Sequence, residues 1–203
     1  MSNIASDKFK DQQGKSFVSV LIGEQLWMAE NLDVSCFSNG DIIQQAKSAE
    51  EWEDAGDEAK PAWCYYQYDE GNGLKYARLY NWYAVNDPRG LAPEGWHIPT
   101  DEEWDMLSGQ LGKDAGSKLK YIENWKENVK ANNEAGFNAL PGGYCNESGA
   151  FRGLDETACF WSVTESNENF AVYRFLRHDS DELFRLDYGK GDGFSCRCVK
   201  DEK

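Results

Sequence analysis

Cysteine, histidine and clustered carboxylates are the residues of this sequence whose chemistry could support catalysis or metal binding. The chain has six cysteines and two histidines, and Cys196 and Cys198 are separated by one residue. In a strand, side chains two residues apart share a face at about 6 to 7 Å, whereas a disulfide needs Cβ atoms about 3.8 Å apart. We expect no disulfide between them. No C-x-x-C pair occurs, so the spacing does not favour zinc.

The histidines do not sit in a catalytic pattern. His97 lies in the segment Gly-Trp-His-Ile-Pro that leads into an expected helix, where packing or a backbone hydrogen bond accounts for it. His178 lies beside an expected turn. The sequence contains no Walker loop, no G-x-S-x-G elbow, no H-E-x-x-H and no dinucleotide fingerprint. We therefore expect a protein that is not an enzyme.

Two groups of acidic residues could bind calcium. The first group, Asp101, Glu102 and Glu103, begins an expected helix, whose dipole and cap explain carboxylates there. The second group is Asp179, Asp181 and Glu182, in an expected turn where Asp is common for conformational reasons. Calcium at the second group stays an open alternative. We expect no other cofactor.

Local patterns predict the elements that position these residues. Thr100 and Glu103 form a T-x-x-E capping box, and apolar residues then recur at helical spacing until Gly112, which predicts a helix over 100–111. The spacing of Leu79, Trp82 and Tyr83 predicts a second helix over 76–85. A short helix is expected around 46–53.

Strands are expected on either side of these helices. The β-branched run 17–22 and the aromatic run 62–68 predict strands, the latter buried on both faces. Residues 112–157 have weak periodicity and are expected to form long loops with short β segments. From residue 158, four short runs separated by tight-turn compositions predict an antiparallel meander of three or four strands.

The predicted fold class is therefore α+β, with two helices packed on a small twisted antiparallel sheet and long irregular loops. No composition break marks a linker, so we expect a single domain over 9–201 after an N-terminal extension, 1–8.

Composition limits the partners. The formal charge is −15, which repels nucleic acid at long range and favours a cation, a neutral sugar or a basic protein surface. No apolar run is long enough to span a membrane, and no signal peptide precedes the first charged residues. Aromatic residues make up 14% of the chain, a level typical of a loop-rich domain held together by large flat side chains.

The C-terminal meander carries a candidate binding surface. Along its second and third runs, Tyr173, Phe175 and Phe184 alternate with residues that are also bulky or charged, so neither strand places all its apolar groups on one side. Aromatic and Arg side chains outside a tidy core are typical of recognition surfaces. The alternative is that further loops cover them.

Six motifs in this order resemble the Fibrobacter succinogenes major paralogous domain family. They are Trp27-Met28-Ala29-Glu30-Asn31-Leu32, Leu79-Tyr80-Asn81-Trp82-Tyr83-Ala84-Val85, the run from Gly95 to Trp104, the run from Gly136 to Tyr144, Phe160-Trp161-Ser162 with Thr164-Glu165, and Gly193-Phe194-Ser195 with Arg197-Cys198-Val199. The resemblance spans residues 9–201. Its usual cysteines match Cys64 and Cys198, whereas the other four cysteines depart from its pattern.

The resemblance implies a C-type lectin-like fold, related to the formylglycine-generating enzyme and to the variable proteins of diversity-generating retroelements. It also implies a bacterial surface or extracellular protein without enzyme activity, whose export signal or lipid anchor lies outside this sequence. In the retroelement relatives the segment matching 164–192 contacts a protein or carbohydrate ligand. The candidate ligand-binding residues, all expected to be exposed, are Tyr173, Phe175, Arg177, His178, Phe184, Leu186, Tyr188 and Asp192.

Two other functions remain open. A copper-dependent oxidase of the formylglycine-generating type would need a pair of neighbouring cysteines, for which Cys196 and Cys198 are the nearest match. A structural adhesin or surface protein is the other alternative. The sequence does not choose the ligand, the oligomeric state or the disulfide pairing.

Overall fold

The chain folds as a mixture of helices and curled sheets, which confirms the α+β class. The computed structural model describes residues 8–127 and 129–201, and over these residues it has five α-helices, one 3₁₀ helix and thirteen strands. The strands are β1 (Lys8–Lys10), β2 (Ser16–Ile22), β3 (Gln25–Met28), β4 (Gln44–Gln45), β5 (Ala62–Cys64), β6 (Leu79–Tyr80), β7 (Trp96–His97), β8 (Gly142–Cys145), β9 (Phe151–Leu154), β10 (Thr157–Glu165), β11 (Phe170–Arg177), β12 (Phe184–Gly189) and β13 (Val199–Lys200). The helices are α1 (Ala49–Asp57), η1 (Tyr66–Tyr68), α2 (Glu70–Tyr76), α3 (Trp82–Val85), α4 (Asp101–Leu111) and α5 (Ala115–Leu119).

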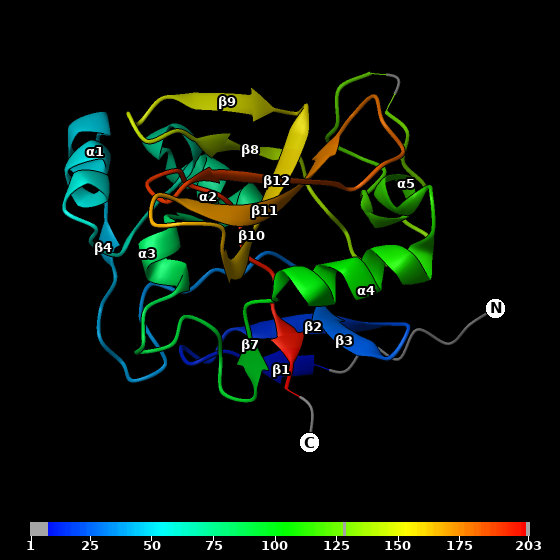
Figure 1. Cartoon of the computed structure of the whole chain (residues 1–203), viewed down its shortest axis with the longest axis horizontal. Helices are drawn as coiled ribbons and strands as arrows, with labels where there is room; N and C mark the ends of the chain where they lie inside the picture. The colour runs from blue at the N-terminus through cyan, green and yellow to red at the C-terminus, as the bar shows by residue number, and fades with distance from the viewer. Residues whose placement is uncertain (1–7, 128, 202–203) are drawn as a thin grey trace.

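Three sheets organise these elements. The first has the order β1-β2-β3-β13-β7, the second β12-β11-β10-β8-β9 and the third β4-β5-β6. Figure 1 shows the second sheet above and the first below, with α4 between them at the right and α1 at the left edge of the molecule. Helix α4 packs against β10 and β11. The first and last strands of the chain thus share one sheet, and the C-terminal hairpin belongs to another.

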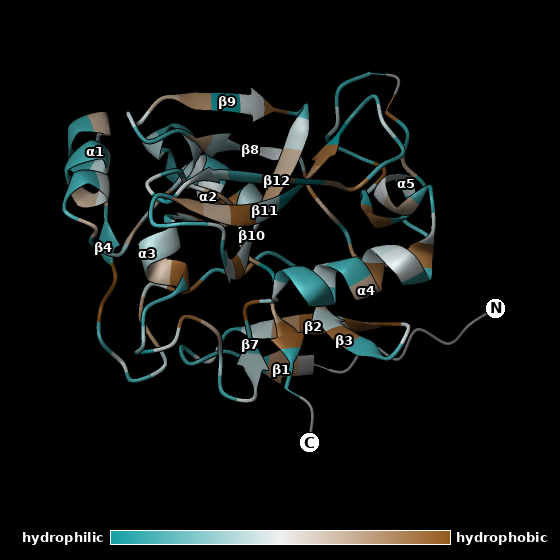
Figure 2. Cartoon of the chain, in the orientation of Figure 1, coloured by the Kyte–Doolittle hydropathy of each residue, from teal (hydrophilic) through white to brown (hydrophobic). Residues whose placement is uncertain are grey.

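Tryptophan side chains fill the interior, as the sequence analysis expected. All eight are buried, with exposed fractions of 9% or less. Trp27 and Trp104 lie 4.7 Å apart between ring centroids, and Trp104 lies 5.8 Å from Phe160, which joins α4 to both large sheets. Figure 2 shows brown hydrophobic segments on β2 and β11, whereas the connecting turns are largely teal.

Helix α4 confirms the predicted capping box. The Thr100 side chain accepts a hydrogen bond from the Glu103 N–H, and the Glu103 carboxylate accepts one from the Thr100 N–H at 2.8 Å. The helix ends where Gly112 adopts a φ of 81°, a left-handed conformation that suits glycine.

The predicted helix over 76–85 is confirmed only for its end, Trp82–Val85, and is wrong for the residues before it. Helix α2 ends at Tyr76, and residues 79–80 form strand β6, in which the Tyr80 backbone exchanges hydrogen bonds with Phe194. Asn81 then caps the single turn of α3, its side chain accepting from the Ala84 N–H. Long-range strand pairing outweighs the local helical spacing here.

Other elements also differ from the expectations. The run 62–68 is a buried strand only over β5, because Tyr66–Tyr68 turn into a 3₁₀ helix, and the short helix lies at 49–57 with Ser48 as its N-cap. Helix α5 lies within the expected loops of 112–157.

The predicted fourth strand of the meander does not extend it. Its end, β13, pairs with β3 and β7 in the first sheet instead, so the meander has three strands. Of the expected extension 1–8, only Lys8 lies within the described residues, and it begins β1.

Candidate binding surface on the C-terminal hairpin

Strands β11 and β12 form the hairpin that carries most of the predicted site. Their antiparallel register places Tyr173 opposite Leu186, Phe175 opposite Phe184 and Ala171 opposite Tyr188. Directly opposed residues of an antiparallel pair share a face. The bulky residues of this alternation therefore lie on one face of the sheet.

The rings on this face are in contact with one another. Phe175 stacks on Phe184 at 4.8 Å between centroids and on Tyr173 at 5.7 Å, and Tyr173 lies 5.8 Å from Tyr188. Tyr144 of β8 meets Tyr188 edge-on at 6.3 Å. The cluster is therefore built from three strands of the sheet.

Part of the cluster is open to solvent. Leu186 is 49% exposed and Tyr188 39%, and Phe175, Phe184 and Tyr144 are partly buried. We call these five residues the hairpin surface. The expectation of an accessible aromatic patch holds for them.

The predicted exposure of Tyr173 and Asp192 is wrong. Tyr173 is 8% exposed because its ring packs on Phe194, at 4.5 Å between centroids, and on Trp161. Asp192 is 3% exposed, and its carboxylate accepts a hydrogen bond from the Glu147 N–H at 3.1 Å. Burial, together with the charge of Glu147, raises the pKa of Asp192 to about 7.

Arg177 and His178 lie at the opposite end of the hairpin from Tyr188. The Arg177 guanidinium is exposed but is bound to Asp179, with 2.7 Å between Nη2 and Oδ2. His178 is half-buried, and its backbone N–H donates to the Glu156 carbonyl. Arg177 is therefore engaged within the turn that follows β11, and His178 is bound to the turn between β9 and β10.

Arginines on the other face of the hairpin anchor helix α4. Arg174 and Arg185 are opposed in the register, and both bind the carboxylate of Asp101, the first residue of α4. Arg174, whose side chain is 4% exposed, also reaches Asp105 at 2.8 Å. This anchor explains why charged residues alternate with aromatic ones. The sequence analysis attributed Asp101 to the dipole and cap of the helix. The arginine on each of the two strands was a signal that a carboxylate would lie against this face.

The acidic group in the turn has partners within the protein. Asp179 binds Arg177, and Asp181 accepts from the Ser117 hydroxyl at 2.6 Å and binds Lys130 at 3.0 Å. Within residues 8–127 and 129–201, no three His, Cys, Asp or Glu side chains are grouped to hold a metal ion.

The cysteines are unpaired thiols, five of them buried and Cys36 partly buried. All six are free, and Cys196 and Cys198 are both fully buried in one hydrophobic cluster. The expectation that these two do not bridge is confirmed. Burial raises the pKa of both thiols, so they are protonated at neutral pH.

Comparison with known proteins places the sequence in one family. The family model described as the Fibrobacter succinogenes major domain matches residues 20–200. No curated protein and no solved structure matches the chain. In the described part of the chain, no helix is long and apolar enough to cross a membrane.

Proposed function

The chain belongs to the Fibrobacter succinogenes major domain family, and we propose that it is a non-catalytic binding domain whose hairpin surface contacts a protein ligand. The observation that carries the proposal is the contiguous exposed set on β12, Leu186 and Tyr188, beside the partly buried rings of Phe175, Phe184 and Tyr144. Large aromatic side chains that rest on a packed layer supply much of the energy of protein interfaces.

The position of β12 adds to this support. It is the outermost strand of its sheet, so its outer backbone edge has no neighbouring strand among the described residues. An extended peptide can pair with such an edge while its side chains contact the adjacent rings.

A protein ligand is favoured over a carbohydrate because the charged side chains of the hairpin lie on its other face or at its turn end, and all of those below are already engaged. Arg177 is bound to Asp179, Arg185 is bound to Asp101, and Asp187 accepts from the Ser166 hydroxyl at 3.2 Å. The surface therefore offers apolar area more than free hydrogen-bonding groups. A carbohydrate ligand is the alternative outcome of the test below.

Paired alanine substitutions test the proposal. We expect Leu186→Ala with Tyr188→Ala to weaken capture of a protein ligand from surface extracts by at least about tenfold, because two exposed contact side chains are lost. The melting temperature should stay within a few degrees, since both residues are largely exposed. Ile42→Ala, which removes an isoleucine 84% exposed elsewhere, is the matched control.

Two outcomes would contradict the proposal. Equal ligand capture by the double variant and the control would show that the hairpin surface does not contact the ligand. Binding to a glycan array that the double variant loses, without any protein capture, would show that the ligand is a carbohydrate.

The finer proposals follow the family resemblance. The fold is C-type lectin-like, an assignment compatible with first and last strands that share a sheet. The segment 164–192, which holds four of the five hairpin-surface residues, is a diversified region at the bacterial surface. A reverse transcriptase gene beside this one, with a template repeat of the segment, would support diversification. Cell fractionation tests the location, and recovery in the cytosol alone would contradict it.

A further inference from the structure

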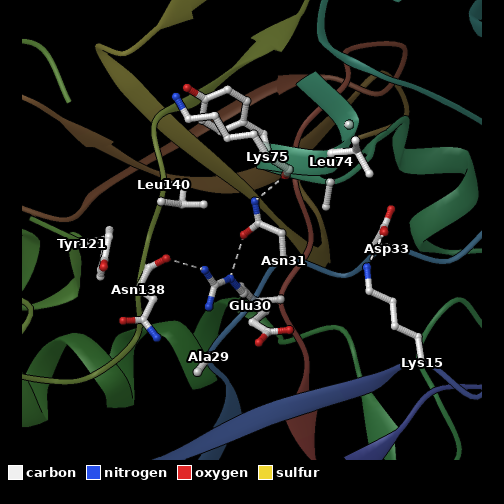
Figure 3. A pocket seen from close by; sticks show the side chains of 14 residues that line it. Lys15, Ala29, Glu30, Asn31, Asp33, Leu74, Lys75, Tyr121, Asn138 and Leu140 are labelled. Carbon is white, nitrogen blue, oxygen red and sulfur yellow. Dashed lines mark hydrogen bonds and ion pairs between the residues drawn. The ribbon is translucent and has the colours of Figure 1, made fainter. Parts of the chain in front are cut away.

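A cavity of about 420 Å³ lies on a different part of the molecule from the hairpin surface. Its walls come from the chain that follows β3, from α2 and from the segments around Tyr121 and Asn138. Figure 3 shows Tyr121, Asn138 and Leu140 on one side and Leu74, Asp33 and Lys15 on the other. This volume is within the range of small-molecule sites.

A buried guanidinium borders the cavity. Arg197 is 1% exposed, and its N–H groups donate to the Asn31 side-chain oxygen at 2.9 Å and to the carbonyls of Met28, Phe137 and Asn138 at 2.9, 2.6 and 3.2 Å. All four acceptors are neutral. A guanidinium has five N–H donors, so these partners leave one N–H over.

The charge of Arg197 is therefore balanced only at longer range. Burial lowers the pKa of Arg197 to about 9, and the charge of Glu30 acts in the opposite direction. At neutral pH the group is still a cation. A buried cation without a hydrogen-bonded anion gains from an anionic neighbour.

The other charges around the cavity also favour an anion. The cavity is lined by three basic residues, Lys15, Lys75 and Arg197, and by two acidic residues, Glu30 and Asp33. The chain as a whole has a net charge of −15. Asp33 is already paired, with Lys15 and with Arg78. Among the described residues, Lys75 forms no ion pair, and its Nζ lies 4.7 Å from the Tyr76 ring centroid. The cavity is thus a locally positive site on an acidic protein.

Apolar side chains complete the walls. Leu74, which is 93% exposed, and Leu140 line the cavity together with Tyr121, which is partly buried. We propose that this cavity binds a small organic anion, whose carboxylate lies toward Arg197 and Lys75 and whose apolar body packs against Leu74, Leu140 and Tyr121.

Benzoate is a suitable probe because it combines a carboxylate with a flat apolar ring. In a titration followed by NMR, benzoate should produce saturable shifts of the Asn31 and Asn138 side-chain amides and of the Arg197 Nε–H. Benzamide, which is neutral and nearly the same shape, should bind at least about tenfold more weakly, because it lacks the charge. Leu186→Ala with Tyr188→Ala should leave benzoate binding unchanged, which separates this site from the hairpin surface.

A charge reversal at Lys75, which lines the cavity, provides a second test in the same titration. Lys75→Glu should weaken benzoate at least about fivefold, because it replaces an attraction with a repulsion close to the carboxylate. Lys47→Glu makes the same change of net charge at an exposed lysine that does not line the cavity, and it should have little effect. Lys75→Gln should fall between the wild-type protein and Lys75→Glu.

The proposal would be overturned by any of three results. The first is the absence of saturable shifts at these groups up to about 20 mM benzoate, a concentration at which a site with a Kd of about 1 mM would be almost saturated. The second is equal binding of benzoate and benzamide. The third is the same loss of affinity in Lys75→Glu and Lys47→Glu.

Discussion

At the scale of single residues, Asp192 shows how burial changes a side chain that sequence analysis placed on the surface. Asp192 lies in the turn that follows β12, where burial and the charge of Glu147 raise the pKa of its carboxyl group to about 7. In the unfolded chain an Asp has a pKa of about 3.9. The folded state therefore binds more protons than the unfolded state between about pH 4 and pH 7.

This difference predicts a pH dependence of stability. The contribution of Asp192 to the free energy of unfolding should fall as the pH rises through this window, by at most about 1.4 kcal/mol per pH unit, and stay low above pH 7. Asp192→Asn should remove that part of the slope. Urea denaturation of both proteins at pH 5, 6, 7 and 8 measures it, and parallel curves would contradict the assignment.

Tyr173 is the other residue whose role the fold reassigns. Its ring packs between Phe175 and Phe194 and is almost completely buried. We expect Tyr173→Ala to destabilise the protein by about 3 to 5 kcal/mol, as for other large core aromatics. Tyr173→Phe keeps the ring and should change stability by much less. Chemical denaturation measures the free energy of unfolding of the two variants. A small loss in the alanine variant would contradict a core role for Tyr173 and would support its place in the binding surface.

At the scale of elements, the Arg174–Asp101–Arg185 contact joins the hairpin to α4. The Arg174 side chain is 4% exposed, whereas that of Arg185 is 50% exposed, although both bind the same carboxylate. Loss of Arg174 leaves the Asp101 carboxylate, 12% exposed, with only the solvent-screened Arg185 and also removes a buried side chain from the interior. Loss of Arg185 leaves the buried pair in place, and an exposed ion pair contributes little because water and salt screen it.

The two arginines should therefore differ in their effect on stability. We expect Arg174→Ala to cost about 3 to 5 kcal/mol and Arg185→Ala about 1 kcal/mol or less. Thermal and urea unfolding of the two variants provides the comparison, in which each serves as the control for the other. Equal losses would mean that Arg174 does not hold α4 in the way described.

At the scale of the whole molecule, His97 connects the last described residues to the middle of the chain. Its Nδ1 lies 2.7 Å from the Asp201 carboxylate and its Nε2 lies 2.6 Å from that of Glu103. These contacts raise the pKa of His97 from 6.5 to about 9. The imidazolium therefore links β7, α4 and the end of β13.

The pKa of His97 is higher in the folded protein than in the unfolded chain. The contribution of its ion pairs to the free energy of unfolding is therefore complete below about pH 6.5 and is lost as the pH rises through 9. The side chain is 37% exposed, so screening reduces its size. We expect His97→Gln to lower stability at pH 6 and to have much less effect at pH 10. An equal loss at both pH values, measured by urea unfolding, would show that packing and not charge is responsible.

The tests of the two proposed sites can be read separately at this scale. The hairpin surface belongs to the second sheet, and the cavity lies between segments from distant parts of the chain, with Arg197 beside it. Neither Leu186 nor Tyr188 lines the cavity. A variant that affects one site should therefore leave ligand binding at the other unchanged.

The sequence by itself determined the features that depend on near neighbours or on burial of large apolar groups. The capping box of α4, strand β2 and the three-stranded meander follow from short-range chemistry and alternation. Burial of the tryptophans follows from the free energy of removing large rings from water. Family membership follows from the ordered motifs.

Only the tertiary structure decided the features that depend on partners far along the chain. Tyr80 is in a strand and not in a helix because it pairs with Phe194, and β13 leaves the meander because it pairs with β3. Tyr173 and Asp192 are buried for the same kind of reason, since the segments that cover them are distant in sequence. Arg197 borders a cavity because its acceptors come from around residues 28–31 and 137–138. A local sequence pattern does not show which distant segments will make contact. The free energy of those contacts exceeds the small local preferences on which the sequence predictions rest, so the contacts decide the structure.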